Sequence, residues 1–340
     1  MIDLRSDTVT KPTQEMLDTM FSASVGDDVF GDDPTVIQLQ DQISKMFGME
    51  SAIYCPSGTM TNQIAIKAHT NPGDEVICDR SSHIYVYEGG GIARNSGVST
   101  RLLHGDRGRY KASDVIQNIN PDDEHFPITT LVSIENTCNK GGGSIWNFDD
   151  IIEIAEVCKK RNLKLHLDGA RLFNALAETK EDPKDFGKMF DSISICLSKG
   201  LGAPIGSLLL GNNDFIKKAR RIRKVFGGGM RQVGYIAAAG IFALENNLLR
   251  LKEDHKRSKI IEDTLKSLPY IKSIMPVETN LIVFELEEDM NINIFLKKLE
   301  ENDIYAIKTG HQLIRMVTHL GFTDEMLDST ISTLNNISIY

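Results

Sequence analysis

A lysine and an aspartate near the middle of the chain have the types and surroundings that suit covalent chemistry. Lys199 follows the apolar run SISIC and precedes a glycine-rich turn, and Asp168 ends the run LKLHLD, 31 positions earlier (199 − 168 = 31). A lysine amine can hold an aldehyde as a Schiff base, and a carboxylate can keep a pyridine nitrogen protonated. The pair therefore indicates a site for pyridoxal phosphate.

The residues around Lys199 and Asp168 allow either an ordinary structural role or a cofactor site. A lysine at the end of a strand is usually a solvated charge on an apolar stem. Here, however, Ser198 can donate a hydrogen bond to a phosphate, and Gly200 and Gly202 allow a ligand close to the backbone. Asp168 could cap the next helix, but a position at the carboxyl edge of a sheet, where open α/β folds bind ligands, favours the cofactor role. Arg171, three residues later, could form a bidentate pair with a substrate or cofactor oxygen.

Two further segments could bind a phosphate. Ser57, Gly58 and Thr59 precede a helical stretch, so that free amides and the positive helix end would attract an anion. An ordinary helix cap explains the same three residues equally well. In the segment FGGGMRQVG and the basic run KKARRIRK before it, Arg231 and Lys224 could also approach an anion. That basic run is most simply a solvated helix face.

Two histidines are candidates for proton transfer or ring stacking. His83, in SSHIYVYEGGG, could stack on an aromatic cofactor ring, although a lone histidine in an apolar neighbourhood is more often structural. His125, in DDEHFPIT, could act as a base because an unperturbed imidazole titrates near neutral pH. The residues alone leave both assignments open.

The elements that must position these residues alternate between short apolar runs and amphipathic stretches. The predicted strands are 75–79, 129–135, 164–168, 192–196 and 206–211. The stretch 147–162 has apolar residues at helical spacing, with Asn147 as its N-cap. This pattern predicts an α/β fold with a mostly parallel sheet between two layers of helices.

The carboxyl-terminal part of the chain differs in composition. After a helix-like stretch at 235–250, the sequence becomes more charged and leads into the runs NLIVFEL and LIRMVTH. We therefore expect a large cofactor-binding domain over 1–249, which includes the N-terminal arm, and a smaller α+β domain over 250–340.

Composition limits the class of partner. The 340 residues carry a net charge of −9, which argues against a nucleic-acid binder and favours small molecules. The five scattered cysteines lack CxxC spacing, which predicts reduced thiols in a cytoplasmic protein and neither a disulfide framework nor a metal site. No signal-like segment opens the sequence, and the longest apolar run, YIAAAGIFAL, is too short to cross a membrane.

Several longer motifs are distributed along almost the whole chain. They are MIDLRSDTVTKPT, GDDVFGDDPTV, PSGTMTNQIA, SSHIYVYEGGG, the ENT of SIENTCNKGGG, HLDGARLFNA, SICLSKGLGAPIGS, GGGMRQVG, LKEDHKRS and IRMVTH. Together they resemble the low-specificity L-threonine aldolases, which belong to the pyridoxal-phosphate enzymes of the aspartate aminotransferase fold type. The resemblance implies fold type I and cleavage of threonine, allo-threonine and related β-hydroxy-α-amino acids to glycine and an aldehyde.

The resemblance also implies roles for individual residues. Lys199 would be the Schiff-base lysine, Asp168 would hold the ring nitrogen, His83 would stack on the ring, and Gly58 and Thr59 would hold the phosphate. In a second group, Ser6, Arg171 and Arg315 would grip the substrate carboxylate, Lys224 and Arg231 would lie on the phosphate side, Tyr87 would shape the side-chain pocket, and His125 would be a candidate to take the β-hydroxyl proton. Cys138 departs from the family pattern at a position often held by histidine.

The family implies assembly as well. We expect a homotetramer whose sites lie at dimer interfaces, so that basic residues on the phosphate side could come from a neighbouring subunit. The same lysine, aspartate and arginine could also serve a β-eliminating lyase or an aminotransferase of the same fold type. A non-enzymatic sensor that keeps the cofactor pocket is a third hypothesis.

Overall fold

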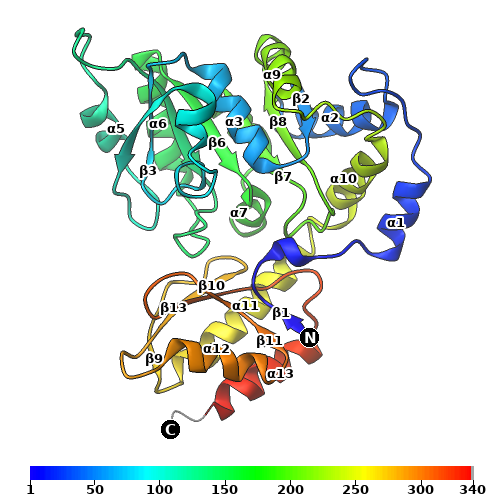
Figure 1. Cartoon of the computed structure of the whole chain (residues 1–340), viewed down its shortest axis with the longest axis vertical. Coiled ribbons are helices and arrows are strands. Elements are labelled where there is room, and N and C mark those ends of the chain that lie inside the picture. The colour runs from blue at the N-terminus through cyan, green and yellow to red at the C-terminus, as the bar shows by residue number, and fades with distance from the viewer. Residues whose placement is uncertain (338–340) are drawn as a thin grey trace.

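The computed structural model describes residues 1–337, and its largest feature is a seven-stranded sheet built from short apolar runs (Figure 1). In spatial order the strands are β2 (Ser51–Cys55), β8 (Ser207–Gly211), β7 (Ser192–Cys196), β6 (Lys164–Gly169), β5 (Thr129–Glu135), β3 (Glu75–Asp79) and β4 (Ser99–Leu103). In this sheet β8 alone runs against the other six strands. The prediction of a mostly parallel sheet is confirmed.

Helices cover both faces of this sheet because alternate side chains of each strand point in opposite directions. In β2, Ile53 and Cys55 pack with α3 (Gly58–His69) and α9 (Asn213–Val225), whereas Ala52 and Tyr54 pack with α2 (Pro34–Phe47) on the other face. The helices of the large lobe are α1 (Gln14–Phe21), α2 (Pro34–Phe47), α3 (Gly58–His69), α4 (His83–Val86), α5 (Ala112–Asn118), α6 (Phe148–Arg161), α7 (Leu172–Thr179), α8 (Pro183–Met189), α9 (Asn213–Val225) and α10 (Gly234–Asn246), with short turns η1 (Asp7–Val9) and η2 (Ile92–Ser96).

Local signals in the sequence set the ends of these helices. The side chain of Asn147 accepts a hydrogen bond from the N–H of Asp149 and so begins α6, as predicted. The same helix ends at Asn162, whose φ of 56° lies in the left-handed region that asparagine tolerates. Ser57 begins α3 in the same way, because its Oγ accepts from the N–H of Met60.

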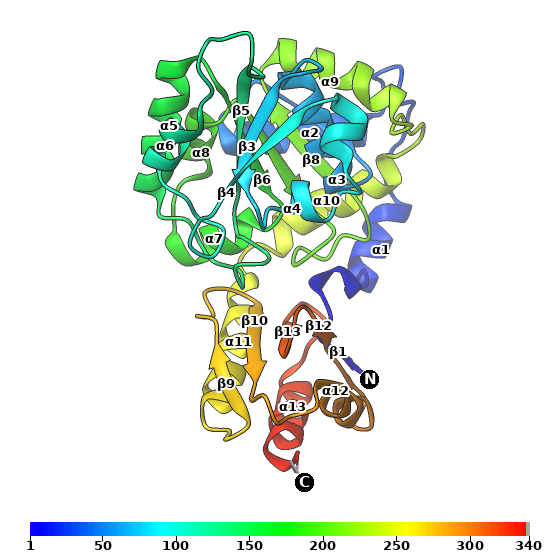
Figure 2. The same cartoon turned by 60° about the vertical axis from the view of Figure 1, so that its left-hand side comes forward.

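A second, smaller lobe lies below the first in Figures 1 and 2. It contains α11 (Leu251–Lys266), β9 (Ile271–Ile274), β10 (Leu281–Leu286), α12 (Ile292–Glu300), β11 (Ile304–Tyr305), β12 (Ile307–Lys308), β13 (Leu313–Val317) and α13 (Asp324–Asn336). Strands β12, β13, β10 and β9 form an antiparallel sheet. Its buried side chains form a core of their own with α11, α12 and α13.

Residues 1–13, which precede α1, form the N-terminal arm, and the first residues of this arm belong to the small lobe. Strand β1 (Ile2–Asp3) pairs in parallel with β11 (Figure 1). The side chains of Ile2 and Leu4 are buried in the small-lobe core. The sequence-based division assigned the whole arm to the large domain, and the structure differs at this point because two apolar side chains find their burial elsewhere. The proposed boundary between residues 249 and 250 stays a prediction.

The length and polarity of the helices bear on whether the chain could cross a membrane. Within residues 1–337, every helix is too short or too polar to serve as a membrane span.

The arm gives a prediction for stability. Leu4 is fully buried, and its backbone bonds to Tyr305 and Val317. We expect Leu4→Ala to lower the free energy of unfolding by about 2–5 kcal/mol, because the substitution leaves a cavity in the small-lobe core. Urea denaturation measures this difference, with Lys11→Ala, at an exposed site of the same arm, as the control. Equal stability of the two variants would contradict the described position of the arm.

Candidate active site

The site lies where neighbouring parallel strands end. Glu135 and Asp168 are paired in the register of β5 and β6, and Asp168 is next to Ser194 of β7. Lys199 follows the end of β7 by three positions (199 − 196 = 3). The carboxyl ends of parallel strands share one edge of a sheet, which is the usual ligand-binding edge of open α/β folds.

Asp168 is held firmly at this edge. Its side chain is 2 % exposed, and its Oδ2 accepts a hydrogen bond of 2.8 Å from Nδ2 of Asn62. Its Oδ1 accepts from the N–H of Ala170 at 3.2 Å. The carboxylate therefore has a fixed orientation before any ligand binds.

His83 lies close to Asp168 and is tied to two other carboxylates. Its Nδ1 is 3.0 Å from Oε1 of Glu88, and its backbone N–H donates to Oε2 of Glu135 at 2.7 Å. Burial disfavours the charged imidazole, but the hydrogen bond to Glu88 and the charges of Asp168 and Glu88 raise the pKa of His83 above its ordinary value. A charged ring is suited to donate hydrogen bonds and poorly suited to act as a base.

Glu135 and Glu88 complete a group of buried carboxyls. Burial and the nearby charge of Asp168 raise the pKa of Glu135 to about 7. Atoms of His83, Glu88 and Asp168 come within 4.8 Å of one another, a spacing that a cation could use. One amide, that of Asn62, already donates to both Glu88 and Asp168, so hydrogen bonds account for the closeness of the two carboxylates.

Arg171 forms a buried, bidentate ion pair with Asp7. Its Nε and Nη2 donate to the two carboxylate oxygens of Asp7 at 2.8 and 2.7 Å. Burial opposes the charge on Asp7, but Arg171 outweighs it and holds the pKa of Asp7 far below its usual range. Because that pKa is depressed, the pair stabilises the fold fully above pH ~4 and less as the pH falls toward the native pKa.

A cavity of about 440 Å³ between the two lobes is lined by six of the predicted site residues. Its lining residues are Ser6, Thr8, His83, Tyr87, Asn139, Arg171, Lys199, Ile307, Lys308, Thr309 and Arg315. The structure therefore brings the lysine, both arginines, the serine, the tyrosine and the stacking histidine to one space. Residues from the N-terminal arm, the large lobe and the small lobe all contribute to it.

Arg315 has an unused donor in this region. Its Nη1 donates to Oδ1 of Asn139 at 2.9 Å, and its Nη2 donates to the carbonyl oxygen of Arg5 at 3.0 Å. Its Nε is buried without a hydrogen-bond partner within residues 1–337. Burial and the positive charge of Arg171 lower the pKa of Arg315. An anion between the two guanidinium groups would relieve both the repulsion and the unsatisfied donor.

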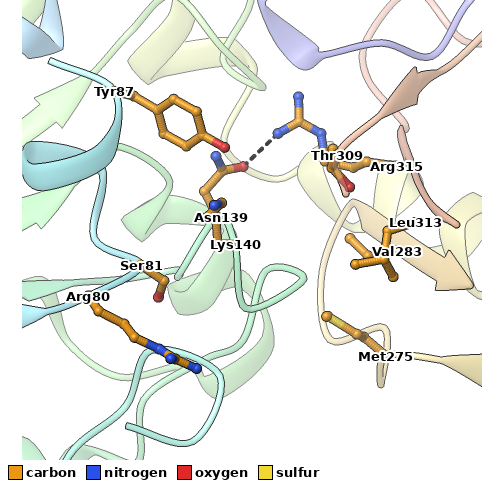
Figure 3. Close-up of a pocket in the computed structure, with 10 residues that line it drawn as sticks. All are labelled: Arg80, Ser81, Tyr87, Asn139, Lys140, Met275, Val283, Thr309, Leu313 and Arg315. Atoms are coloured by element: carbon orange, nitrogen blue, oxygen red, sulfur yellow. Dashed lines mark hydrogen bonds between the residues drawn. The ribbon is translucent and has the colours of Figure 1, made fainter. Parts of the chain in front are cut away.

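A second cavity, of about 360 Å³, adjoins the first and shares Tyr87, Asn139, Thr309 and Arg315 with it. Figure 3 shows the large-lobe residues on one side of this space and the small-lobe residues on the other, with the bond from Arg315 to Asn139 between them. Met275, Val283 and Leu313 supply apolar surface on the small-lobe side, whereas Arg80, Ser81 and Lys140 line the other side.

The start of α3 lies next to the end of β7. A side-chain carbon at Gly58 would come within 2.5 Å of Sγ of Cys196, so the glycine is required for this close approach. Gly58 and Thr59 are the first two residues of the helix, where N–H groups have no acceptor within the helix. Ser57 and Thr59 are exposed, and Ser198 is partly exposed. The predicted phosphate cradle therefore has its open amides beside the segment that carries Lys199.

Lys224, Arg231 and His125 also line neither cavity of the single chain. Lys224 and Arg231 are exposed, and Arg231 donates to Asp27 at 2.7 Å. His125 is exposed in the loop before β5, where its Nδ1 is 2.7 Å from Oδ1 of Asp123. That loop is at the amino end of the strand, whereas Glu135 and the site are at its carboxyl end. One chain does not bring His125 to Lys199.

Known proteins resemble this chain over nearly its whole length. The model of the beta-eliminating lyase family matches residues 3–289. The low-specificity L-threonine aldolase of Escherichia coli (strain K12) is 42 % identical over 328 residues, which cover 96 % of each chain. The chain therefore belongs to the low-specificity L-threonine aldolase family. The low-specificity L-threonine aldolase 1 of Arabidopsis thaliana is 39 % identical over 338 residues, which cover 97 % of this chain and 94 % of that one. A solved threonine aldolase of Leishmania major has a TM-score of 0.85 at 22 % identity, covers 98 % of this chain and 99 % of its own, and supports the fold.

Within this threonine aldolase scaffold, several site residues carry no signal that single-sequence reasoning could use. Asp7, Asn62, Glu88, Glu135 and Asn139 were all missed. They are common polar types in ordinary segments, and each acts through a partner far away in the sequence. Four of them are revealed by their burial beside Arg171, His83 or Asp168, and Asn139 is revealed by its hydrogen bond from Arg315.

The ion pair gives a second prediction. We expect Asp7→Asn to lower the free energy of unfolding by about 3–5 kcal/mol at pH 7, because it leaves the buried Arg171 without a countercharge. The double variant Asp7→Asn with Arg171→Met should recover part of that loss, since no buried charge remains unpaired. Chemical denaturation of the wild type, of Asp7→Asn, of Arg171→Met and of the double variant checks both statements. A double variant that loses the full sum of the two single losses would contradict the pairing.

Proposed function

We propose that this chain cleaves L-threonine, L-allo-threonine and related β-hydroxy-α-amino acids to glycine and an aldehyde, with pyridoxal phosphate as cofactor. One observation carries the proposal: a single cavity contains Lys199 together with Arg171 and Arg315, at the sheet edge where Asp168 is fixed. The relatives named threonine aldolase cover nearly the whole chain and give the specific reaction.

The residues present fit the cofactor. The amine of Lys199 can bind its aldehyde, the oriented carboxylate of Asp168 can accept a hydrogen bond from its ring nitrogen, and the amides of Gly58 and Thr59 can hold its phosphate. Ser57 and Ser198 could add hydroxyl donors to the phosphate. When bound, pyridoxal phosphate supplies an electron-withdrawing ring that stabilises the charge left at Cα.

The two arginines and Ser6 would bind the substrate carboxylate. Asp7 already engages two donors of Arg171, so this guanidinium offers its remaining N–H groups, while Arg315 offers the buried Nε. A carboxylate fixed on two guanidinium groups restricts rotation of the substrate about Cα. The clamp therefore selects which bond at Cα is positioned to break.

The base for the β-hydroxyl proton is a separate question. The raised pKa of His83 favours a charged ring, which suits stacking and hydrogen-bond donation more than proton abstraction. His125 is the other candidate, but in its own chain it lies before the amino end of β5, whereas the site is at the carboxyl end. We propose that His125 reaches the site of a second copy of the chain, while Tyr87 borders the substrate side chain.

Assembly follows from the same reasoning. Several large apolar side chains are exposed on the large lobe, namely Phe21, Phe30, Val225, Tyr235 and Leu249. They lie in or beside the segments that carry α1, the end of α9 and α10, where Lys224 and Arg231 are also found. We propose a homotetramer in which such surfaces are covered and Lys224 and Arg231 approach the cofactor phosphate of a neighbouring subunit. The five cysteines are free and buried, which supports a reducing, cytoplasmic location.

Other fold-type-I reactions are the main alternative. A β-eliminating lyase or an aminotransferase could use the same lysine, aspartate and arginines. The products separate these reactions, because only aldol cleavage of threonine yields acetaldehyde and glycine, whereas transamination requires a 2-oxo acid. Any turnover would exclude a purely sensory role.

Removal of the lysine is the direct test of the proposed reaction. We expect wild-type holoenzyme to release acetaldehyde from threonine in an assay coupled to alcohol dehydrogenase. Lys199→Ala should reduce this turnover by more than about 10³-fold, because the cofactor loses its covalent anchor. Borohydride treatment should label the peptide that contains residue 199 in the wild type and leave that peptide unlabelled in the variant. Full activity in the variant, or a label on another peptide, would reject the assignment.

Hybrid oligomers test the shared site. We expect His125→Ala to reduce kcat by roughly 10²–10⁴-fold if the imidazole is the base. Co-expression of His125→Ala and Lys199→Ala chains should restore activity, because a mixed dimer has one site with both native side chains. Sedimentation measures the oligomer in each preparation. Absence of recovery in confirmed mixed oligomers would contradict a base supplied by a second copy.

A further inference from the structure

A buried chain of hydrogen bonds runs from the last residue of α3 toward the site. Nε2 of His69 is 2.8 Å from Oγ of Ser192, and the same Oγ is 2.8 Å from Nδ1 of His166. Nε2 of His166 is 3.1 Å from Oδ1 of Asn62. His166, Ser192 and Asn62 are at most 2 % exposed. None of these four residues lines the cavity described above.

Asn62, at the end of this hydrogen-bond chain nearest the site, fixes the donor-to-acceptor direction of its bonds. Nδ2 of Asn62 donates to Oδ2 of Asp168 and to Oε1 of Glu88, each at 2.8 Å. Carboxylate oxygens accept hydrogen bonds, so the amide nitrogen must face them and the amide oxygen must face His166. Oδ1 of Asn62 accepts as well, and its partner in His166 must therefore be an Nε2–H group.

The remaining protons follow from that tautomer. With its proton on Nε2, a neutral His166 accepts at Nδ1, so the hydroxyl of Ser192 donates to it and accepts in turn from Nε2–H of His69. Burial lowers the pKa of His166 to about 4 and that of His69 to about 3. Both rings are therefore uncharged at neutral pH, and every bond in the chain points toward Asp168.

We propose that His166 is a positioning residue, which as the neutral Nε2–H tautomer holds the amide of Asn62 in the orientation that donates to both Asp168 and Glu88. A carboxylate that receives such an N–H is stabilised in its charged form. A charged Asp168 is the form that keeps a cofactor ring nitrogen protonated. The inference rests on the proposed function for this last step, whereas the orientation of Asn62 is independent of it.

The opposing explanation is that the chain merely fills the polar part of the core. A reversal of Asn62 distinguishes the two, because it would place the amide oxygen against two carboxylates. Loss of the donor at residue 166 leaves Oδ1 of Asn62 without a partner, so that the amide can turn away from its present position more easily, and retention of the donor keeps the amide in place. The appropriate pair of variants therefore differs in the N–H group and not in size.

His166→Gln and His166→Met form that pair. Glutamine can present an N–H at about the reach of Nε2, whereas methionine has similar length and no donor. We expect the glutamine variant to cleave threonine within about threefold of the wild-type kcat, and the methionine variant to fall by roughly tenfold or more, because it loses a hydrogen bond that orients a charged group. Thermal unfolding of both holoenzymes reports any general loss of stability.

The decisive readout is the protonation of the cofactor ring and not the rate. Pyridoxal phosphate labelled with ¹⁵N at the ring gives distinct NMR shifts for its protonated and unprotonated forms. We expect the protonated signal in the wild type and in His166→Gln, and a shift toward the unprotonated signal in His166→Met. A wild-type signal in both variants, or the same shift in both, would overturn the positioning role.

Neutron diffraction of wild-type crystals tests the chain without any substitution. We expect deuterium on Nε2 of His166, none on its Nδ1, and the ND₂ group of Asn62 directed at Asp168 and Glu88. Deuterium on Nδ1 of His166, or a reversed amide, would overturn the inference even if both variants failed to fold. A wild-type protein that bound no cofactor would reject the proposed function instead, and the neutron map would still decide the direction of the chain.

Discussion

The buried ion pair between Asp7 and Arg171 is the contact on which the arrangement of the site depends. Asp7 comes from the arm, Arg171 from the start of α7 in the large lobe, and Asn280 of the small lobe donates to the same carboxylate at 3.2 Å. One carboxylate thus joins three parts of the chain at the point where the cavity opens. A buried charge that lost its partner would be costly, which makes the relative position of these parts sharply defined.

The sheet edge adds a second constraint, which concerns charge. Three carboxyls, those of Asp168, Glu135 and Glu88, are buried close together, and like charges at such separations raise the free energy of the folded state. Donors around them compensate: the amide of Asn62, the side chain of Gln63 and backbone N–H groups of residues 83, 139 and 170. The surplus negative potential is suited to a cationic ring or a protonated ligand.

Much of the fold could be predicted because it depends on local signals. The five predicted strands correspond to β3, β5, β6, β7 and β8, since each is a short run dominated by branched or leucine side chains. Strands β2 and β4 were missed, and β4 begins with polar residues and is only partly buried at the sheet edge. The pairing of β1 with β11 could not be predicted, because two-residue strands carry no periodicity and their partner is far away in the sequence.

The site residues likewise divide into those with local sequence signals and those defined only by distant contacts. Lys199, Asp168, Arg171 and His83 lie in motifs whose neighbours limit their use to a few kinds of chemistry, and the structure brings the lysine, the arginine and the histidine to one cavity. Asn62 could not be recognised, because its importance comes from two carboxylates and one imidazole that approach it only in the folded chain. The position of His125 at the other end of β5 shows a third case, in which one copy of the sequence does not define the neighbours of a residue.

The parallel pairing of β1 with β11 bears on the synthesis of the protein. Ile2 pairs with Ile304, 302 positions later (304 − 2 = 302), so it is synthesised well before its partner. At translation rates of roughly 5–20 residues per second, this strand waits for about 15–60 s before its partner exists. During that interval Ile2 and Leu4 have no core to enter, so these two apolar side chains stay beside the nascent large lobe, where a chaperone could shield them until the small lobe is made.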